Sequence, residues 1–448
     1  MTASGTIASA PGALPVVGHG LRMVRDPLAF LSSLPAHGDL VRVGLGPHRV
    51  VMVCTPALTR QVLLDTTTFD KGGPLYDRLR ELLGSGLATC PAREHRRLRR
   101  LSQPSFQPDR MAVYARAMSE LAADLAASWR HGQVIDAARE SNRLTTRILV
   151  RAMFSASGEG RAHDGMIDDV DVVVERMFRR SIVPEPVNHL PTRANHRYER
   201  ALSRMRDRIG GIVAARRAAP ADHGDLLSAL LQAADAAGSD ADLRLTEQEV
   251  ADQMMTFFVA GTKSTASTLA WALYLLATHP HEQTRVHRAA ARALAAGQVP
   301  GAGPPVLPEA EQVITETLRL FPPGWLLTRQ ATRDTTLGAA SIAAGTTVAF
   351  SAWIMHRRPD LYPEPDRFLP GRWEAPRARG AFVPFGAGAR QCIGDRFAVT
   401  EMALTLAHIT SRWQLVPVGR APKVAVETAL VPRGMRLRVL ARGHARGE

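Results

Sequence analysis

Cysteine is rare in this chain, and its distribution excludes a disulfide-based scaffold. Cys54, Cys90 and Cys392 form an odd, scattered set of three without a CxxC spacing. Such a set is typical of proteins from a reducing compartment. Residues 1–10 lack the basic and apolar regions of a signal peptide, and no run of about 18 apolar residues could span a membrane. We therefore expect a cytoplasmic protein without a membrane anchor.

Aromatic residues and lysine are also scarce. Aromatics make up 5% of the chain, and Lys71, Lys263 and Lys423 are its only lysines, although Lys and Arg together outnumber Asp and Glu by 56 to 42. The resulting net charge of +14 can attract nucleic acids, membranes or acidic proteins. However, the arginines are spread along helical segments without interleaved aromatics, which disfavours a stacking platform for single strands. We expect no nucleic-acid partner and place most of these charges on solvated helix faces.

Hydrophobic periodicity predicts a mainly α-helical protein with small β-sheets. The longest helix is expected over residues 246–279, because the His-Pro pair at its end stops it. Further helices are expected at residues 112–130, 144–154, 198–217, 225–237, 309–320 and 395–412. A length of 448 residues would by itself allow two or three domains.

Strand patterns are confined to a few places. Residues 40–45 and 48–53 predict a hairpin around Gly46-Pro47, and residues 335–350 predict a second one around Ala344-Gly345. Residues 424–439 are also strand-like. Two segments are expected to be irregular: the Pro/Gly loop at 298–308 and the Pro-rich stretch at 357–382, whose length inside a compact domain usually indicates function.

The segment Phe385-Gly-Ala-Gly-Ala-Arg-Gln-Cys-Ile-Gly394 combines residue types that packing alone does not explain. Its glycines allow the main chain to pass close to a flat ligand, and Phe385 offers an aromatic face to it. Cys392 lies just before a predicted helix, whose N-terminal N–H groups favour a thiolate and lower the thiol pKa. Arg390 adds a cation nearby. Cys54 and Cys90, in contrast, are expected to be inert buried thiols.

This segment resembles the haem-binding loop of the cytochrome P450 family. The resemblance implies that Cys392 is the proximal ligand of a haem b iron, where a thiolate favours O–O cleavage. Residues 11–19 resemble the family's proline-rich entry, and residues 342–346 resemble a family turn in which Ala343 replaces proline. The resemblance covers essentially the whole chain, so it implies a single domain, residues 1–448, with the cytochrome P450 fold.

Two further segments extend the resemblance to the proximal side of the haem. Glu316 and Arg319 are three residues apart on one helix face and can pair, which alone would indicate only a surface ion pair. Phe368-Leu-Pro-Gly-Arg372-Trp373 resembles the family element whose arginine joins such a pair in a buried network. The resemblance therefore gives Glu316, Arg319 and Arg372 a structural role behind the haem.

The resemblance also implies which residues reach the haem propionates. His95 and Arg99 are one helical turn apart, as in the family's propionate-binding helix, and Arg329 and Arg390 match two further propionate arginines. Anionic propionates need cationic or hydrogen-bonding partners. For the neighbouring arginines at positions 96, 97 and 100, the alternative is a solvated or partner-facing basic patch.

The long helix departs from the family pattern. Ala260-Gly261-Thr-Lys263-Ser264-Thr265 resembles the family's Ala-Gly-x-Asp/Glu-Thr-Thr, whose acid and alcohol relay protons to dioxygen. We expect Gly261 to let the helix widen locally. Ser264 can replace threonine as a hydrogen-bonding hydroxyl beside Thr265, but Lys263 cannot act as a carboxylate.

Two accounts of Lys263 remain open. Either its side chain faces away and pairs with a carboxylate elsewhere, leaving Ser264 and water to deliver protons, or oxygen activation is slow and poorly coupled. The substitution Lys263→Glu is hypothesised to raise the coupling of electron use to product.

The expected substrate pocket is apolar, so it suits a hydrocarbon-like molecule. Its candidate lining residues, of which helical periodicity makes about half plain core, are Met255, Phe258, Val259, Trp325, Leu326 and Leu327. Within the family, residues 12–19, 26–30 and 37–39, together with Trp325 and the Leu-Thr-Arg sequence ending at Arg329, resemble terpene oxygenases of actinobacteria. The resemblance implies oxidation of a sesquiterpene or related terpenoid in secondary metabolism.

The same resemblance implies the reaction partners. One partner is O2. The electrons are expected from a ferredoxin and its reductase, because the chain shows no flavin domain. An acidic ferredoxin would be steered to a basic face around Arg96, Arg97, Arg100 and Arg390. Rising salt should then slow reduction.

Three other classes of protein stay open. A peroxide-dependent haem-thiolate enzyme would use Lys263 to hold a fatty-acid carboxylate, a non-catalytic haem-binding protein would bind ligand without turnover, and a DNA-binding protein would contain no haem.

Overall fold

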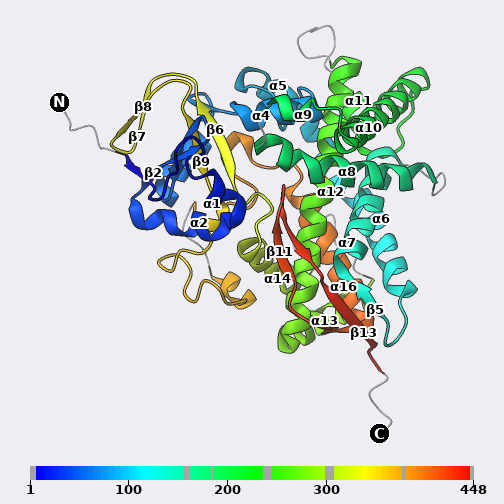
Figure 1. Cartoon of the computed structure of the whole chain (residues 1–448). Helices are drawn as coiled ribbons and strands as arrows, with labels where there is room; N and C mark the ends of the chain where they lie inside the picture. The colour runs from blue at the N-terminus through cyan, green and yellow to red at the C-terminus, as the bar shows by residue number, and fades with distance from the viewer. Residues whose placement is uncertain are drawn as a thin grey trace.

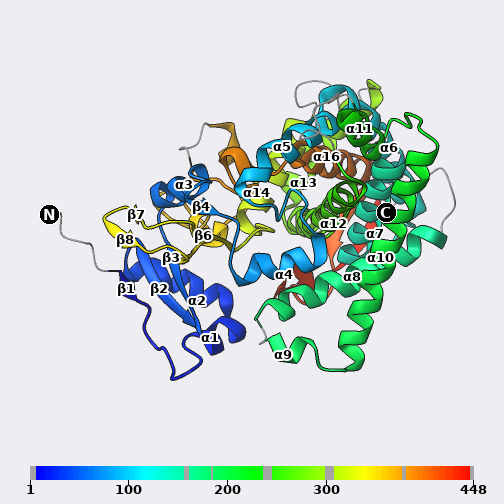
Figure 2. The ribbon, with the colours of Figure 1, turned by 90° about the horizontal axis from the view of Figure 1, so that it is seen from above.

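The computed structural model describes residues 7–155, 161–182, 185–235, 245–297, 307–375 and 380–443. A strand-rich lobe built from the N-terminal region and residues near 330–350 lies beside a larger helical lobe (Figure 1). Seen from above, α12 (Glu247–Thr278) runs through the helical lobe, with further helices around it (Figure 2). The architecture is therefore mainly α with small sheets, as predicted.

The strand-rich lobe is organised by one sheet with the strand order β1-β2-β3-β9-β6-β4. Its strands are β1 (Ala8–Ser9), β2 (Leu40–Leu45), β3 (His48–Val53), β4 (Phe69–Asp70), β6 (Leu327–Ala331) and β9 (Thr347–Phe350). The hairpin of β2 and β3 has the predicted bounds and pairs Leu40 with Val53. Buried side chains on the two faces of the sheet pack into two separate apolar clusters.

The second predicted hairpin is wrong in its register. β7 (Thr335–Leu337) pairs with β8 (Ala340–Ile342), so the chain turns at Gly338 with a φ of 60°. The turn at Ala344-Gly345 instead leads into β9, which pairs with β3 and β6. Both turns contain glycine, and the sequence pattern alone did not distinguish which of them closes the hairpin.

The helical lobe and the connections contain the remaining helices. Their bounds are α1 (Gly20–Arg25), α2 (Pro27–Ser33), α3 (Pro56–Leu64), α4 (Pro74–Leu83), α5 (Ala92–Ser102), α6 (Pro108–Ser128), α7 (Ala137–Phe154), α8 (Arg161–Ile182), α9 (Glu185–Asn188), α10 (Arg193–Ala218), α11 (Leu226–Asp235), α13 (Pro280–Ala295), α14 (Pro308–Leu320), α15 (Ala352–Met355) and α16 (Asp395–Arg412). The predicted helix at 395–412 has the observed bounds of α16. Helices α8 and α13 were not predicted, because charged residues interrupt their apolar pattern.

Helix α12 forms because its ends are well defined and its length is apolar. Thr246 and Glu249 make a reciprocal capping box at its start, and His279 ends it before Pro280. Buried residues lie on all sides of the helix, which is the pattern of a central helix rather than of a surface one. It packs against α7, α10, α14 and α16. The predicted long helix at 246–279 is therefore confirmed.

The C-terminal strands form two small sheets. β10 (Trp413–Pro417), β13 (Arg436–Ala441) and β5 (Val134–Asp136) form one, and β11 (Lys423–Val426) and β12 (Leu430–Arg433) form the other. The predicted irregular segment at 357–382 contains a short 3-10 turn at Pro370–Glu374, and its residues 376–379 lie outside the described part. Most of the predicted loop at 298–308 also lies outside it. Within the described residues, no helix is long and apolar enough to cross a membrane.

Candidate active site

The loop that precedes α16 is held in a tight conformation that needs its glycines. Gly386 and Gly388 have φ values of 71° and 70°, a region that other residues rarely adopt. A Cβ on Gly388 would also lie 3.0 Å from the Leu63 carbonyl oxygen. The Cys392 N–H donates to the Phe385 carbonyl oxygen at 2.9 Å and closes the loop. Both glycines are therefore required by their backbone conformation, and Gly388 is also required by its contact with α3.

The Cys392 thiol is accessible, yet its pKa is raised. Desolvation by the surrounding protein raises the pKa, and it outweighs the Gly394 N–H and the Arg99 charge, which lower it. The N–H of Gly394, the N-cap of α16, lowers the pKa as predicted, but in the protein alone desolvation and the Asp395 carboxylate outweigh it, so the net pKa of Cys392 is raised.

Basic side chains from three parts of the chain gather beside this loop. His95 on α5 is buried, and its pKa is lowered to about 3 by burial and then by the charges of Arg390, Lys71, Arg99 and Arg329. The Arg99 guanidinium donates to the Gln391 carbonyl oxygen next to Cys392. The structure thus brings together the four predicted propionate-binding residues and adds a fifth basic group.

Lys71 is the residue that sequence reasoning missed. Its Nζ donates to the Ala88 carbonyl oxygen at 2.8 Å, and burial together with Arg329 and Arg390 lowers its pKa to about 7. Because lysines are so few in this chain, a single lysine directly after β4 was the available signal. A partly buried lysine among arginines is costly unless an anion joins them.

Arg329 shows that the cluster is not fully satisfied by the protein. This buried side chain donates from Nη1 to the Tyr76 hydroxyl at 3.0 Å and to the Thr328 carbonyl oxygen at 2.7 Å. Its Nε is buried without a hydrogen-bond partner. An anionic group beside Arg329, Arg99 and His95 would meet this need, and haem propionates have the appropriate charge. The residues present therefore fit haem, which supplies the iron chemistry when bound.

Arg390 has protein partners that were not predicted. Its Nη2 donates to Asp70 at 2.7 Å, and its Nη1 donates to the Cys90 carbonyl oxygen at 2.9 Å. Asp70 also accepts from the Ala92 N–H at 2.8 Å, which fixes the start of α5. Arg390 therefore connects the cysteine loop to α5, in addition to its electrostatic effect on His95.

The predicted pairing of Glu316 with two arginines is confirmed. Arg319 donates to both Glu316 oxygens at 2.9 Å, and the Arg372 Nε donates to one of them at 2.9 Å. The Trp373 indole N–H and the Leu369 N–H complete the set at 2.9 Å and 3.0 Å. Glu316 and Arg319 are both 0% exposed, so the alternative of a surface pair is wrong.

Helix α12 exposes one small stretch in the middle of its buried length. Ala260 is exposed, although the residues from 253 to 259 are buried. The Ser264 hydroxyl, one turn further on and partly exposed, donates to the Ala260 carbonyl oxygen at 2.7 Å. Thr265, in contrast, is buried at 4% exposure. The candidate hydroxyl on the accessible face is therefore Ser264 rather than Thr265.

The structure shows a packing role for Gly261. Helix α12 is continuous as an α-helix through this position. A Cβ on Gly261 would lie 3.0 Å from a Leu149 methyl group on α7. The absent side chain therefore allows the close approach of α7 and α12.

Lys263 forms an ion pair, as the first account of it required. Its Nζ lies 3.4 Å from an Asp171 oxygen on α8. The Asn142 amide on α7 donates to the two oxygens of the same carboxylate at 3.2 Å and 3.0 Å. The lysine is thus held between helices.

The predicted substrate-pocket residues do not all lie in one place. Trp325 is buried in the core of the strand-rich lobe, and its indole N–H donates to the Glu427 carbonyl oxygen at 2.9 Å. Phe258 is fully buried in the helical core, where Val259 is also buried. For Trp325 and Phe258 the plain-core interpretation is therefore the right one. Leu326 and Leu327 are partly exposed and pack on different apolar clusters.

Met255 lines a cavity of about 250 Å³ that lies between α4, α10 and α12. The cavity has mixed walls, which include the apolar Leu82 and Ile209 and the charged Asp252 and Arg206. Met255 thus contacts a space that α10 helps to enclose.

The predicted basic docking face is smaller than expected. Arg96 and Arg100 are exposed on α5, whereas Arg97 pairs with Glu249 at the start of α12. Arg390 is buried and pairs with Asp70. The accessible part of the face therefore rests on Arg96 and Arg100.

Comparison with known proteins agrees with this geometry. Residues 9–436 match the family described as cytochrome P450. The chain belongs to this family, whose members bind haem through a cysteine thiolate.

Individual relatives narrow the comparison. The chain is 41% identical to cyclooctat-9-en-7-ol 5-monooxygenase of Streptomyces melanosporofaciens, over 92% of this chain and 90% of the relative. It is 40% identical to pentalenene oxygenase of Streptomyces avermitilis, over 97% of each chain. A crystal structure of the cytochrome P450DA haem domain superimposes with a TM-score of 0.84 at 26% identity, covering 98% of each chain. The resemblance to actinobacterial terpene oxygenases is therefore confirmed.

Proposed function

We propose that this protein is a haem-thiolate monooxygenase that hydroxylates or otherwise oxidises a sesquiterpene or related terpenoid. Residues 1–448 would form one domain around haem b, with Cys392 as the iron ligand. The observation that carries the proposal is the accessible Cys392 thiol beside a cluster of basic groups around His95 and Arg329, one of which has an unpartnered buried nitrogen. The two relatives named for oxidising pentalenene and cyclooctat-9-en-7-ol support the terpenoid class.

The residues divide into three roles. His95, Arg99, Arg329 and Lys71 would bind the propionates, while Glu316 with Arg319 and Arg372 would brace the chain behind the haem. On α12, the Ser264 hydroxyl would deliver protons to the side of the haem where O2 binds. The partly exposed Leu327 would contribute apolar surface to the substrate.

Electrons would come from a ferredoxin and its reductase. Arg96 and Arg100 offer the accessible positive charge on α5 that an acidic ferredoxin would meet. The three cysteines of this chain form no disulfide, which agrees with the reducing, cytoplasmic compartment that we propose for it.

The ion pair of Lys263 disfavours the peroxygenase alternative. A lysine that holds a substrate carboxylate must present its ammonium to the pocket, whereas this ammonium faces Asp171. A non-catalytic haem-binding protein would have the same propionate-binding cluster. Only a measurement of product formation distinguishes it from a monooxygenase.

The test is reconstitution of the haem-loaded protein with ferredoxin, reductase and a panel of sesquiterpenes and diterpene alcohols. We expect a hydroxylated product that contains one oxygen atom from O2. Product formed with hydrogen peroxide but not with ferredoxin would support a peroxygenase. Spectral shifts on adding terpenes without any product, under all donors, would support a haem-binding protein without catalysis.

A further inference from the structure

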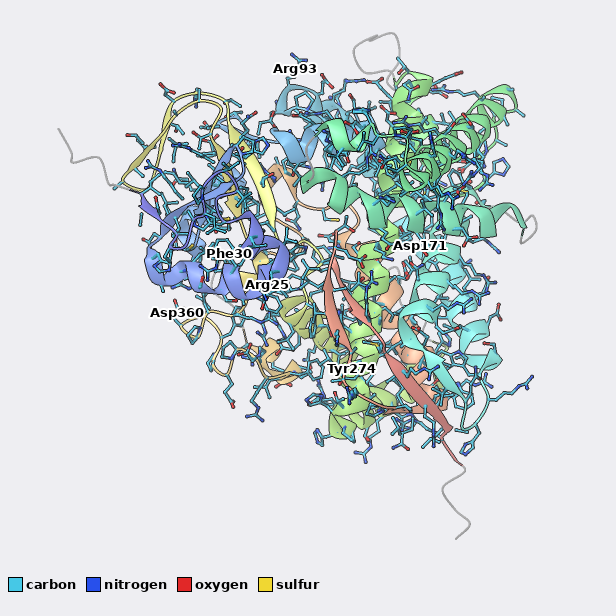
Figure 3. The ribbon with its side chains drawn as sticks, in the orientation of Figure 1. Arg25, Phe30, Arg93, Asp171, Tyr274 and Asp360 are labelled. Carbon is cyan, nitrogen blue, oxygen red and sulfur yellow. The ribbon has the colours of Figure 1, made fainter. Side chains whose placement is uncertain are left out.

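Three helices meet at one carboxylate beside the proton-delivery segment of α12. Asp171 on α8 accepts hydrogen bonds from the Asn142 amide on α7 and pairs with the Lys263 ammonium on α12 at 3.4 Å. Figure 3 labels Asp171 where α8 passes close to α7 and α12. The side chains of Lys263 and Asp171 are 20% and 40% exposed, so the pair lies at the boundary between the interior and solvent.

The neighbouring residues Lys263 and Ser264 point in different directions. Successive helical residues are rotated by about 100°, so one side chain can lie on the exposed stretch around Ala260 while the next faces another helix. Ser264 turns to the exposed Ala260 carbonyl oxygen, whereas Lys263 extends to α8. While Lys263 is paired with Asp171, its ammonium is therefore kept away from the Ser264 hydroxyl.

The other acids on α8 have different surroundings. Asp169 is buried and pairs with Arg204 and Arg208 on α10. Glu175, one turn after Asp171, lies near Arg433 on β12. Among the described residues of α8, Asp171 is thus the acid whose carboxylate reaches α12.

We propose that Asp171 is a positioning residue for oxygen activation: it holds the Lys263 ammonium against α8 and ties α8 to α12. This inference rests on the proposed function. Monooxygenation consumes a C–H bond, O2, two electrons and two protons and yields a C–OH bond and water. The competing reaction combines O2, two electrons and two protons into hydrogen peroxide.

The physical reason lies in the hydration of lysine. A free ammonium is strongly hydrated, so a released Lys263 would bring water and a mobile cation toward Ser264. Proton delivery would then be less controlled, and more of the electrons would end in hydrogen peroxide. The Asp171 carboxylate prevents this by fixing the ammonium on the α8 side.

The experiment compares four variants of the haem-loaded protein: Asp171→Asn, Lys263→Met, their combination, and the charge swap Asp171→Lys with Lys263→Asp. We expect Asp171→Asn to raise the peroxide formed per electron pair several-fold. The double variant Asp171→Asn with Lys263→Met should return toward the original ratio, because no ammonium remains to be released. A merely structural role would leave the double variant as uncoupled as Asp171→Asn alone. The exposed Asp168→Asn on the same helix is the matched control.

A second measurement does not depend on activity. Hydrogen exchange of α8 amides should be about two- to five-fold faster in Asp171→Asn and in Lys263→Met, as expected for a partly exposed ion pair. The charge swap should restore slow exchange, and Asp168→Asn should leave it unchanged.

The outcomes separate this inference from the proposed function. Unchanged α8 exchange in both single variants would overturn the tie, whatever the activity. Product formation with no extra peroxide from Asp171→Asn would overturn the positioning role and leave the monooxygenase function intact. Absence of product with every donor would overturn the proposed function, and the exchange data would still decide whether Asp171 ties α8 to α12.

Discussion

Replacing Glu316 with glutamine tests the buried network behind the cysteine loop. The Glu316 carboxylate accepts five hydrogen bonds, from Arg319, Arg372, Trp373 and the Leu369 N–H. Glutamine keeps the shape but removes the negative charge, and it presents an amide to donors that need an acceptor. The Arg319 guanidinium, which is 0% exposed, would then be a buried charge without a counter-ion.

The expected cost follows from that burial. Breaking a buried ion pair by neutralising one partner costs about 3–5 kcal/mol. With an unfolding entropy of about 2.1 cal/mol/K per residue, a chain of 448 residues loses about 1 K of melting temperature per kcal/mol. We therefore expect Glu316→Gln to lower Tm by about 3–5 °C.

The assay is thermal unfolding of haem-loaded protein, with haem content measured in parallel. Glu364→Gln is the matched control, because Glu364 pairs with Arg367 at the surface of the neighbouring segment. That substitution should change the stability by less than about 1 kcal/mol. Equal effects of the two substitutions would refute the view that Glu316 holds an essential buried charge.

Three further predictions concern charges elsewhere. Burial raises the pKa of Glu401 from 4.5 to about 8. Between these two pH values the folded protein keeps a proton that the unfolded chain releases. The free energy of unfolding therefore falls as the pH rises from 4.5 to about 8. Glu401→Gln should flatten the fall of the free energy of unfolding with pH, by at most ~1.4 kcal/mol per pH unit; identical pH profiles of the variant and the original protein would contradict this. Lys71→Met should speed haem transfer to apomyoglobin about tenfold by removing a charged hydrogen bond, while the exposed Lys423→Met should not. Arg96→Glu should slow reduction by an acidic ferredoxin at low salt, with the difference vanishing at high salt, whereas a salt-independent rate would contradict docking there.

The structure reverses the expected effect of Lys263→Glu on the coupling of electron use to product. The expectation from the sequence assumed that a carboxylate was missing from this region, but Asp171 already supplies one 3.4 Å from the lysine. A glutamate at this position would face Asp171 and repel it. Lower, not higher, coupling is therefore expected from that substitution.

The sequence predicted features that depend on local pattern. The end of the long helix was predicted from its His-Pro stop, and the β2–β3 hairpin from two strand patterns around Gly46-Pro47. The pairing of Glu316 with Arg319 followed from a spacing of three residues, and its connection to Arg372 from the family pattern. These features depend on neighbours in the chain or on a motif, so the sequence contained the information.

Features that depend on the folded neighbourhood were not predictable in this way. The internal partner of Arg390 is Asp70, which lies 320 residues away in the sequence. The partner of Lys263 lies on α8, a helix that the periodicity did not predict. The pKa of Cys392 depends on how much water the whole fold removes, which the position of a helix start does not determine.

The measurement that tests the central claim most directly is the absorption spectrum of the reduced, carbon-monoxide-bound protein. A thiolate ligand from Cys392 predicts the long-wavelength Soret band that distinguishes thiolate-ligated haem from the histidine-ligated haem of globins. Cys54→Ser and Cys90→Ser should keep this band, and Cys392→Ser should abolish it. A band at the globin-like position in the original protein, or a long-wavelength band that survives in Cys392→Ser, would contradict the assignment of Cys392 as the iron ligand.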